Sequence, residues 1–256
     1  MDFQKNIRQK KGKAKIIILT AYDFQMARIL DEMTIDLILV GDSLGMVVQG
    51  YGNTKSVTMA DMLYHVKAVA RGARKTPIVG DMPINSYNTT ENGLLNAKKF
   101  LEAGAHGVKI EGNRPDVVKT LINAEIPVMG HVGMLPQMAE IYRVKGKKPE
   151  EAEEIFRDAL DLEMHGVFSI VLECMPESLA KRITESVKTP TIGIGAGKYC
   201  DGQVLVINDM LGLDETFKPK YVKTYTNLNK TIKDAVAKFV EEVSASTYPD
   251  EEHTYH

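Results

Sequence analysis

Polar side chains suited to acid–base or metal chemistry stand at the ends of several short apolar runs. The candidates are Asp42, Ser43, Asp81, Lys109, Glu111, His131 and Glu173. A buried carboxylate is costly unless it is paired or bound to a metal. Packing alone therefore accounts poorly for this pattern, and the pattern indicates an active site.

Asp42, Asp81 and Glu111 follow three successive apolar runs. Neighbouring strands lie about 5 Å apart, so three such carboxylates could surround one ion. Oxygen ligands alone favour a hard cation such as Mg²⁺, which binds through one or two carboxylates plus substrate and water. Helix caps and ion pairs are the alternative, and they account for Asp42 or Asp81 singly better than for all three acids.

Lys109 lies two residues before Glu111, so on a strand both side chains point to the same face. The lysine could bind a substrate carboxylate or reduce the repulsion among the acids, and a structural salt bridge is the alternative. A Schiff-base role is less favoured, because nearby carboxylates keep the amine charged.

His131 and Glu173 supply two further groups. His131 could bind a metal, move a proton or hydrogen-bond an oxyanion, or it could be an ordinary buried polar residue. Glu173 follows the most apolar run, VFSIVL, where burial would raise its pKa and make it a proton acceptor near neutral pH; a helix cap or ion pair is the alternative. Cys174 would need a nearby base to act as a nucleophile, so a small buried thiol is the favoured interpretation.

Eight strand-like runs must position these groups. They lie at 15–23, 36–43, 77–83, 107–112, 127–133, 167–174, 190–197 and 203–209. Helical patterns alternate with them at 24–33, 58–72, 90–103, 115–124, 149–165 and 176–187, and the last long helix is expected at 227–244. Continuous apolar runs are typical of parallel strands covered on both faces. The pattern predicts an α/β fold, a single (β/α)8 TIM barrel, with an open doubly wound sheet as the alternative.

The length of 256 residues, without a linker or repeat, predicts one domain spanning 1–256. It would have a short N-terminal lead-in, either amphipathic or a solvated basic arm, and a C-terminal extension. The segment between the last two strands is too short for a helix, the loop at 134–148 is long, and GIGAG (193–197) is expected to form a tight turn rather than a dinucleotide site.

Composition narrows the partners. A net charge of −2 gives no general attraction for nucleic acid or an anionic membrane, and no apolar run is long enough to span one. Two isolated cysteines suit a reducing compartment, which favours a cytoplasmic location. The predicted partners are therefore small molecules.

Several blocks of the chain together resemble the ketopantoate hydroxymethyltransferase family, from about residue 15 to the end. They are LTAYD (19–23), VGDSLGMVVQGY (40–51), DMLYH (61–65), GDMP (80–83), VKIEG (108–112), GHVGMLPQ (130–137), LECMP (172–176), IGIGAGKYCDGQVLV (192–206) and EEHTYH (251–256). The resemblance implies a barrel that assembles as a homodecamer. It also implies Mg²⁺-dependent transfer of a hydroxymethyl group from 5,10-methylenetetrahydrofolate to the keto acid 3-methyl-2-oxobutanoate.

The resemblance also implies roles for the candidate residues. Asp42 and Asp81 would bind the metal, with Glu111 in its outer shell, and Glu173 would be the general base. Asp42, Ser43, Asp81, Lys109 and His131 would contact the keto acid. For the folate, Tyr22 is a candidate pocket wall, and Lys147 and Lys148 could meet its glutamate tail.

Two other functions compete with this one. A Mg²⁺-dependent barrel lyase of the phosphoenolpyruvate mutase/isocitrate lyase type also gathers acids at strand ends, but usually adds a catalytic thiol in a flexible loop. A binding barrel without catalysis would have lost one or more of the acids, whereas all of them are present.

Overall fold

The computed structural model describes residues 3–214 and 219–256. The chain separates into two compact units, Met1–Val206 and Ile207–His256. The first unit contains the eight strands of the barrel and every candidate site residue. The single domain predicted for 1–256 stays a prediction.

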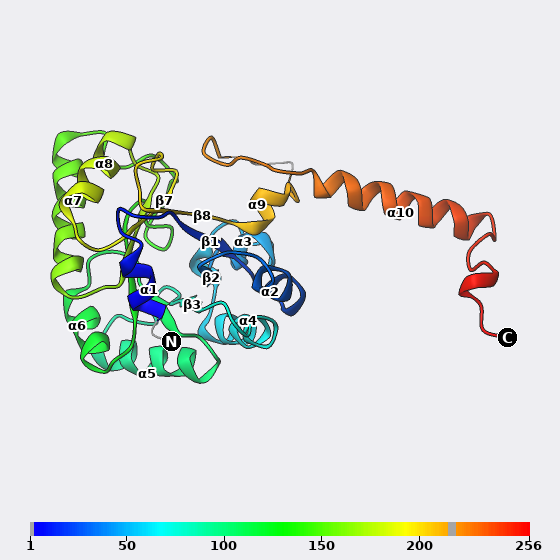
Figure 1. Ribbon diagram of the computed structural model, residues 1–256, viewed down its shortest axis with the longest axis horizontal. Coiled ribbons are helices and arrows are strands. Elements are labelled where there is room, and N and C mark those ends of the chain that lie inside the picture. Colours follow the sequence, from blue (N-terminus) through cyan, green and yellow to red (C-terminus); the bar gives the residue numbers. More distant parts are fainter. Residues whose placement is uncertain (1–2, 215–218) are drawn as a thin grey trace. The chain divides into compact units, whose positions relative to one another are not determined.

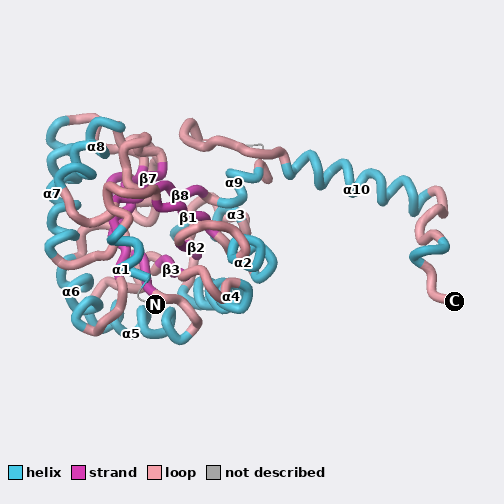
Figure 2. Tube along the Cα trace, viewed as in Figure 1, coloured by secondary structure: helices cyan, strands magenta, loops and turns pink. Residues whose placement is uncertain are grey.

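Eight parallel strands close into a barrel in sequence order (Figures 1 and 2). They are β1 (Ile16–Thr20), β2 (Leu37–Val40), β3 (Ile78–Asp81), β4 (Gly107–Lys109), β5 (Val128–Gly133), β6 (Ser169–Glu173), β7 (Thr191–Ile194) and β8 (Gly202–Leu205). Closure is made by β8 on β1, where Ile16 pairs with Gly202. The predicted barrel is confirmed and the open sheet is wrong. The strands are shorter than the predicted runs, because those runs included the turns at the strand ends.

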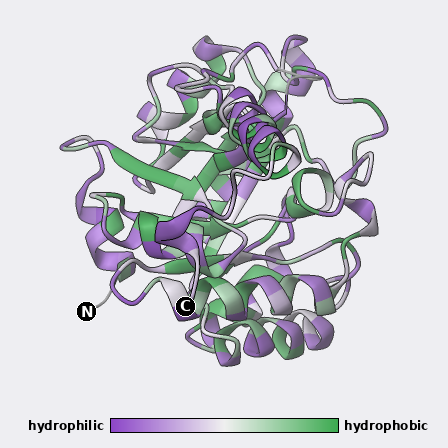
Figure 3. Ribbon diagram, turned by 90° about the vertical axis from the view of Figure 1, so that its right-hand side faces the viewer, coloured by the Kyte–Doolittle hydropathy of each residue, from purple (hydrophilic) through white to green (hydrophobic). Residues whose placement is uncertain are grey.

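Helices surround the strands of this unit. They are α2 (Phe24–Asp31), α3 (Leu44–Val47), α4 (Met59–Gly72), α5 (Thr90–Glu102), α6 (Pro115–Asn123), α7 (Pro149–Met164) and α8 (Glu177–Ser186). Apart from the short α3, each begins and ends within two residues of its predicted bounds. Thr58 caps α4 through a reciprocal capping box with Asp61. Figure 3 shows green, hydrophobic residues along the strands and green residues alternating with purple, hydrophilic ones in the helices.

Alternate strand residues fill the inside of the barrel with apolar side chains. This core consists of Phe3, Ile7, Ile16, Ile18, Leu37, Leu39, Val79, Met129, Phe168, Val171, Ile192 and Val204. Two of its members come from α1 (Phe3–Gln9), where the Phe3 ring meets the edge of Phe168 at 5.3 Å between centroids. Because Phe168 precedes β6, α1 closes the N-terminal end of the barrel. The described part of the lead-in is therefore an amphipathic helix, not a solvated arm.

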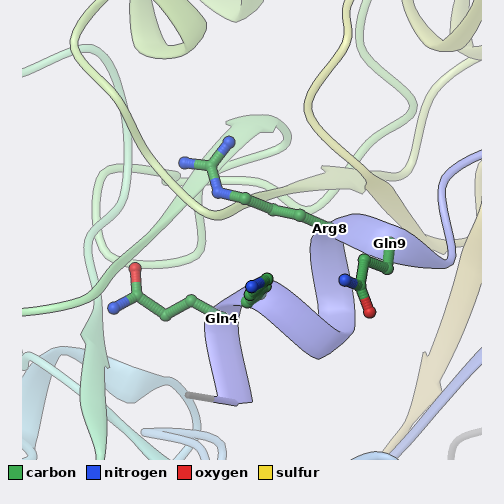
Figure 4. A pocket seen from close by; sticks show the side chains of 4 residues that line it. Gln4, Arg8 and Gln9 are labelled. Atoms are coloured by element: carbon green, nitrogen blue, oxygen red, sulfur yellow. The ribbon is translucent and has the colours of Figure 1, made fainter.

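The outer side of α1 borders a shallow hollow of about 380 Å³, lined by Gln4, Lys5, Arg8 and Gln9 (Figure 4). Arg8 donates hydrogen bonds from Nη2 to the carbonyl oxygens of Gly166 and Val167, at 3.0 and 2.9 Å. These contacts lie at the N-terminal end of the strands, whereas barrel enzymes place their chemistry at the C-terminal end. This hollow is therefore not the candidate active site.

The second unit contains the helices α9 (Ile207–Leu211) and α10 (Leu228–Ser244), followed by the 3-10 helix η2 (Glu251–His253). Asn227 caps α10 by accepting a hydrogen bond from the Lys230 backbone N–H. Among the described residues, no side chain of α10 is buried. The described helices include none that is both long and apolar enough to cross a bilayer.

Candidate active site

An ion pair between neighbouring strand ends stands at the centre of the site. Asp81 and Lys109 are the last residues of β3 and β4 and are paired in register. Lys109 Nζ lies 2.8 Å from Asp81 Oδ1 and 3.9 Å from Glu111 Oε1, and all three side chains are buried. The lysine therefore offsets the repulsion among the acids, as one of its predicted roles requires.

The charge states of Lys109 and Glu111 follow from burial and from each other. Burial alone would lower the pKa of Lys109, but the charges of Asp81, Glu111 and Asp42 together outweigh it and raise that pKa. The amine therefore stays charged, which argues against a Schiff base. Burial raises the pKa of Glu111 to about 8, against the opposing effect of Lys109.

Asp42 stands directly beside Asp81. Its backbone N–H lies 3.5 Å from Asp81 Oδ2, and its own carboxylate is buried. Burial, followed by the charges of Asp81 and Glu111, raises the pKa of Asp42. The backbone of Asp42 thus lies beside the Asp81 carboxylate, which comes from the neighbouring strand.

Gln137 is a buried site residue that the sequence did not single out. Its side-chain Nε2 donates to Asp42 Oδ2 at 2.8 Å, and its backbone N–H donates to Glu111 Oε2 at 3.0 Å. It lies near the start of the long loop at 134–148. An uncharged residue in a loop has no periodicity to reveal it, and only its place in the block GHVGMLPQ gave a signal.

His131, inside β5, links Lys109 to Glu173 at the end of β6. Its Nδ1 lies 3.3 Å from Lys109 Nζ and its Nε2 lies 3.2 Å from Glu173 Oε2. Burial and the charge of Lys109 hold the pKa of His131 well below its usual range, so the ring is neutral. Because an ammonium only donates, the contact with Lys109 favours Nδ1 as the acceptor and the ring proton on Nε2. The contact of Nε2 with Glu173 Oε2 is close but lacks hydrogen-bond geometry.

Glu173 has the environment predicted for a general base. Burial raises its pKa to about 8, against the opposing charge of Lys109. Its side chain is still 12% exposed, more than those of Glu111 and His131. A carboxylate with this pKa ionises near neutral pH while remaining basic enough to take a proton from carbon.

Other polar residues that follow β1 and β2 have different surroundings. Tyr22 is buried, and its hydroxyl lies 2.8 Å from Ser43 Oγ, next to Asp42. Asp23, which also follows β1, instead caps α2 by accepting a hydrogen bond from Met26 N–H at 2.8 Å. Lys147 and Lys148 are exposed.

The glycine loop forms the expected turn, whereas Cys174 is half-buried and not the fully buried thiol that the sequence favoured. Burial, with the charge of Glu173, raises the pKa of Cys174 to about 12, so its thiol stays protonated. Gly195 and Gly197 have φ angles of 66° and 78°, which side chains disfavour, and they form a tight turn.

The acids fit a divalent ion only if substrate and water complete its shell. Within residues 3–214 and 219–256, no three His, Cys, Asp or Glu side chains form a metal site by themselves. The ammonium of Lys109 already stands among the acids. Glu111 Oε1, however, is buried without a hydrogen bond to any described residue. Asp42 and Asp81, with this oxygen of Glu111 near Lys109 Nζ at 3.9 Å and His131 Nδ1 at 3.7 Å, suit Mg²⁺, which binds few protein ligands.

Acid and base groups at the C-terminal ends of the strands define the chain as a barrel enzyme. Residues 2–251 match the family model of ketopantoate hydroxymethyltransferase. A 3-methyl-2-oxobutanoate hydroxymethyltransferase of Clostridium botulinum (strain Langeland) is 51% identical over 254 residues, covering 96% of this chain and 92% of the relative. That of Caldicellulosiruptor saccharolyticus is 51% identical over 258 residues, covering 98% of both. The chain therefore belongs to the ketopantoate hydroxymethyltransferase family and, like these relatives, is a transferase.

Solved structures with the same fold are much more distant in sequence. A phosphonopyruvate hydrolase superposes with a TM-score of 0.66 at 11% identity, covering 100% of this chain and 92% of that one. A 2,3-dimethylmalate lyase of the PEP mutase/isocitrate lyase superfamily gives 0.61 at 13% identity, covering 99% and 92%. At such identities the likeness supports the barrel fold and nothing finer.

Proposed function

We propose that this protein transfers a hydroxymethyl group from 5,10-methylenetetrahydrofolate to 3-methyl-2-oxobutanoate, forming 2-dehydropantoate in the first step of pantothenate biosynthesis. Full-length relatives with that activity in their name support the substrate. The observation that carries the chemistry is Glu173, a base with a pKa of about 8 that His131 connects to the ion-paired acids.

Binding of the keto acid uses charges that the site already holds. Lys109 is a buried ammonium and Ser43 a hydroxyl beside Asp42, so together they bind the substrate carboxylate. Asp42 and Asp81 would hold Mg²⁺, and Glu111 would hold one of its waters. When bound, Mg²⁺ supplies positive charge to the keto oxygen, where negative charge develops as the C3 proton leaves.

Glu173 removes the C3 proton. The neighbouring Nε2–H of His131 keeps a donor near the Glu173 carboxylate and near the developing enolate. The C3 carbon then attacks the one-carbon unit, which the folate presents as an iminium, and the new C–C bond forms as the C=N π electrons move to the nitrogen. The folate carbon carries no oxygen, so water supplies the product hydroxyl: a C–O bond forms, the remaining C–N bond breaks, and tetrahydrofolate leaves with the proton that the water loses.

The experiment is a product assay with the full chain, Mg²⁺, the keto acid and methylenetetrahydrofolate labelled with ¹³C at the transferred carbon. The expected result is a ¹³C-hydroxymethyl signal of 2-dehydropantoate in the NMR spectrum. If the keto acid remains unconverted and no ¹³C-hydroxymethyl signal appears, the proposal is contradicted. Cleavage of 2,3-dimethylmalate or a phosphonopyruvate instead would favour the lyase alternative, although the protonated thiol of Cys174 argues against it.

We also propose a cytoplasmic homo-oligomer, a decamer by family resemblance. Support comes from α10, which exposes a set of apolar side chains: Ile232, Val236, Phe239, Val240 and Val243. A second copy covering them would bury area that is costly in water. Light scattering should give ten times the chain mass of 28.4 kDa, and a monomeric mass would contradict the assembly.

A further inference from the structure

We infer that Gln137 is a positioning residue that orients the carboxylates of Asp42 and Glu111 for a divalent ion. The inference rests on the proposed function, because it concerns the same site. Gln137 is 1% exposed and lies in the loop after β5. It comes from neither of the strands whose acids it contacts.

The hydrogen bonds of Gln137 use every polar group of its side chain. Nε2 has two protons, and it donates to Asp42 Oδ2 at 2.8 Å and to the Met82 carbonyl oxygen at 2.9 Å. Oε1 accepts from the Tyr87 hydroxyl at 2.6 Å. A flipped amide would put Oε1 against two acceptors, so these partners assign the orientation.

Each of the two acids accepts a hydrogen bond from Gln137 through only one of its carboxylate oxygens. Gln137 occupies Oδ2 of Asp42 through its side chain and Oε2 of Glu111 through its backbone. This leaves Asp42 Oδ1 and the buried Glu111 Oε1 for an ion or its waters. Glu111 Oε1 accepts no hydrogen bond from the described residues and lies 3.9 Å from Lys109 Nζ and 3.7 Å from His131 Nδ1. An amide can do this without changing the charge of the site, whereas another acid would add repulsion and another lysine would compete with the ion.

Tyr87 fixes the orientation of the Gln137 amide through the amide oxygen. Tyr87 is buried, and its hydroxyl donates a hydrogen bond to Gln137 Oε1. Partners that orient metal ligands in this way usually change metal affinity or activity roughly 10- to 100-fold when removed. Neighbouring Ser86 offers a matched control, because its buried hydroxyl donates to the Pro83 carbonyl oxygen at 2.7 Å in the same loop as Tyr87.

The test measures Mn²⁺ affinity by the EPR signal of the free ion, with and without 3-methyl-2-oxobutanoate, in wild type, Gln137→Met, Tyr87→Phe and Ser86→Ala. Gln137→Met should weaken binding by roughly 10- to 100-fold. Tyr87→Phe should weaken it less, and Ser86→Ala should leave it unchanged. Turnover by Gln137→Met should recover as Mg²⁺ is raised, whereas a general folding defect would show as a lost circular dichroism signal.

The outcomes separate this inference from the proposed reaction. Equal Mn²⁺ affinity in wild type and a folded Gln137→Met protein would overturn the positioning role while leaving the reaction intact. If Gln137→Met does not fold, Tyr87→Phe decides, and an affinity equal to that of Ser86→Ala would overturn the role. A wild-type protein that forms product yet binds no divalent ion would also overturn it.

Discussion

Lys109 is the residue on which the charge balance of the site depends. It is buried between Asp81 and Glu111, with Asp42 close enough to affect its pKa. Without it, three buried carboxylates would face one another with no lysine to offset their charge. Because Lys109 and these acids are buried, removing the lysine costs far more stability than breaking an ion pair on the surface.

Replacing Lys109 by Met should therefore lower the free energy of unfolding by about 3–5 kcal/mol, measured by urea denaturation at pH 7.5. Lys181→Met is the matched control, because it breaks an exposed pair with Glu185 on α8 and should cost much less. Equal losses in the two variants would show that the buried pair is not a central stabilising contact.

Glu173 gives the pH dependence of the reaction a predictable sign. It works as a base only when ionised, so the rate of C3 proton removal should rise with pH and level off above about 8. Ionising this buried carboxylate costs stability. Relative to Glu173→Gln, the wild type should therefore lose unfolding free energy as pH rises from the usual glutamate range through about 8. A rate that is flat between about pH 6 and 9 would contradict the assignment.

Charged residues at strand ends could be predicted from the sequence, because an acid or lysine next to an apolar run is costly to bury unless it pairs or takes part in chemistry. Asp42, Asp81, Lys109, Glu111 and Glu173 lie where that argument put them. Asp23 also follows an apolar run, but it caps α2 by accepting a hydrogen bond from Met26 N–H. Gln137 escaped notice because its contribution is a set of hydrogen bonds between distant segments, and no local pattern encodes these.

Among the elements, the buried strands and long helices were predictable, whereas the short ones were not. The helix α3 and the 3-10 helix η1 (Thr54–Ser56) have four and three residues, too few for an apolar periodicity to appear. At the start of the chain, α1 has only seven residues, but Phe3 and Ile7 lie four apart and share its buried face.

The contribution of α1 can be measured directly. Phe3→Ala should lower the free energy of unfolding by about 3 kcal/mol, because it removes a ring packed on Phe168 and leaves a cavity at the N-terminal end of the barrel core. Phe3→Leu, which keeps an apolar side chain there, should cost about 1 kcal/mol. Urea denaturation of both variants checks this, and a loss below ~0.5 kcal/mol for Phe3→Ala would mean that α1 does not close the core.

The loop at 134–148 carries the predicted contact with the folate tail. Lys148 lines an open hollow of about 570 Å³ in which Arg143 and Arg157 are offset by three glutamates: Glu150, Glu151 and Glu154. Because these acids reduce the local positive charge, the expected effect is modest. Reversing Lys147 and Lys148 to Glu should raise the folate KM about five-fold, with kcat unchanged. Lys98→Glu on α5 is the control, and an unchanged KM in the double variant would reject the contact.

At the scale of the whole molecule, closure of the barrel turns separations of dozens of residues into direct contacts. Asp42 and Gln137 are 95 positions apart and hydrogen-bonded, and His131 and Glu173 are within 3.2 Å. Barrels with the same architecture at 11–13% identity carry hydrolase and lyase names, so the fold alone does not select the reaction. The choice depends on which groups the strand ends present.

The most direct measurement is hydrogen exchange at C3 of 3-methyl-2-oxobutanoate in D₂O with Mg²⁺, followed by NMR without folate. The wild type should exchange this proton, and Glu173→Gln should be slower by roughly 10²- to 10⁴-fold while keeping its fold. Exchange that persists at the wild-type rate in Glu173→Gln, or a wild type that catalyses none even when folate is added, would contradict the assignment of Glu173 as the base.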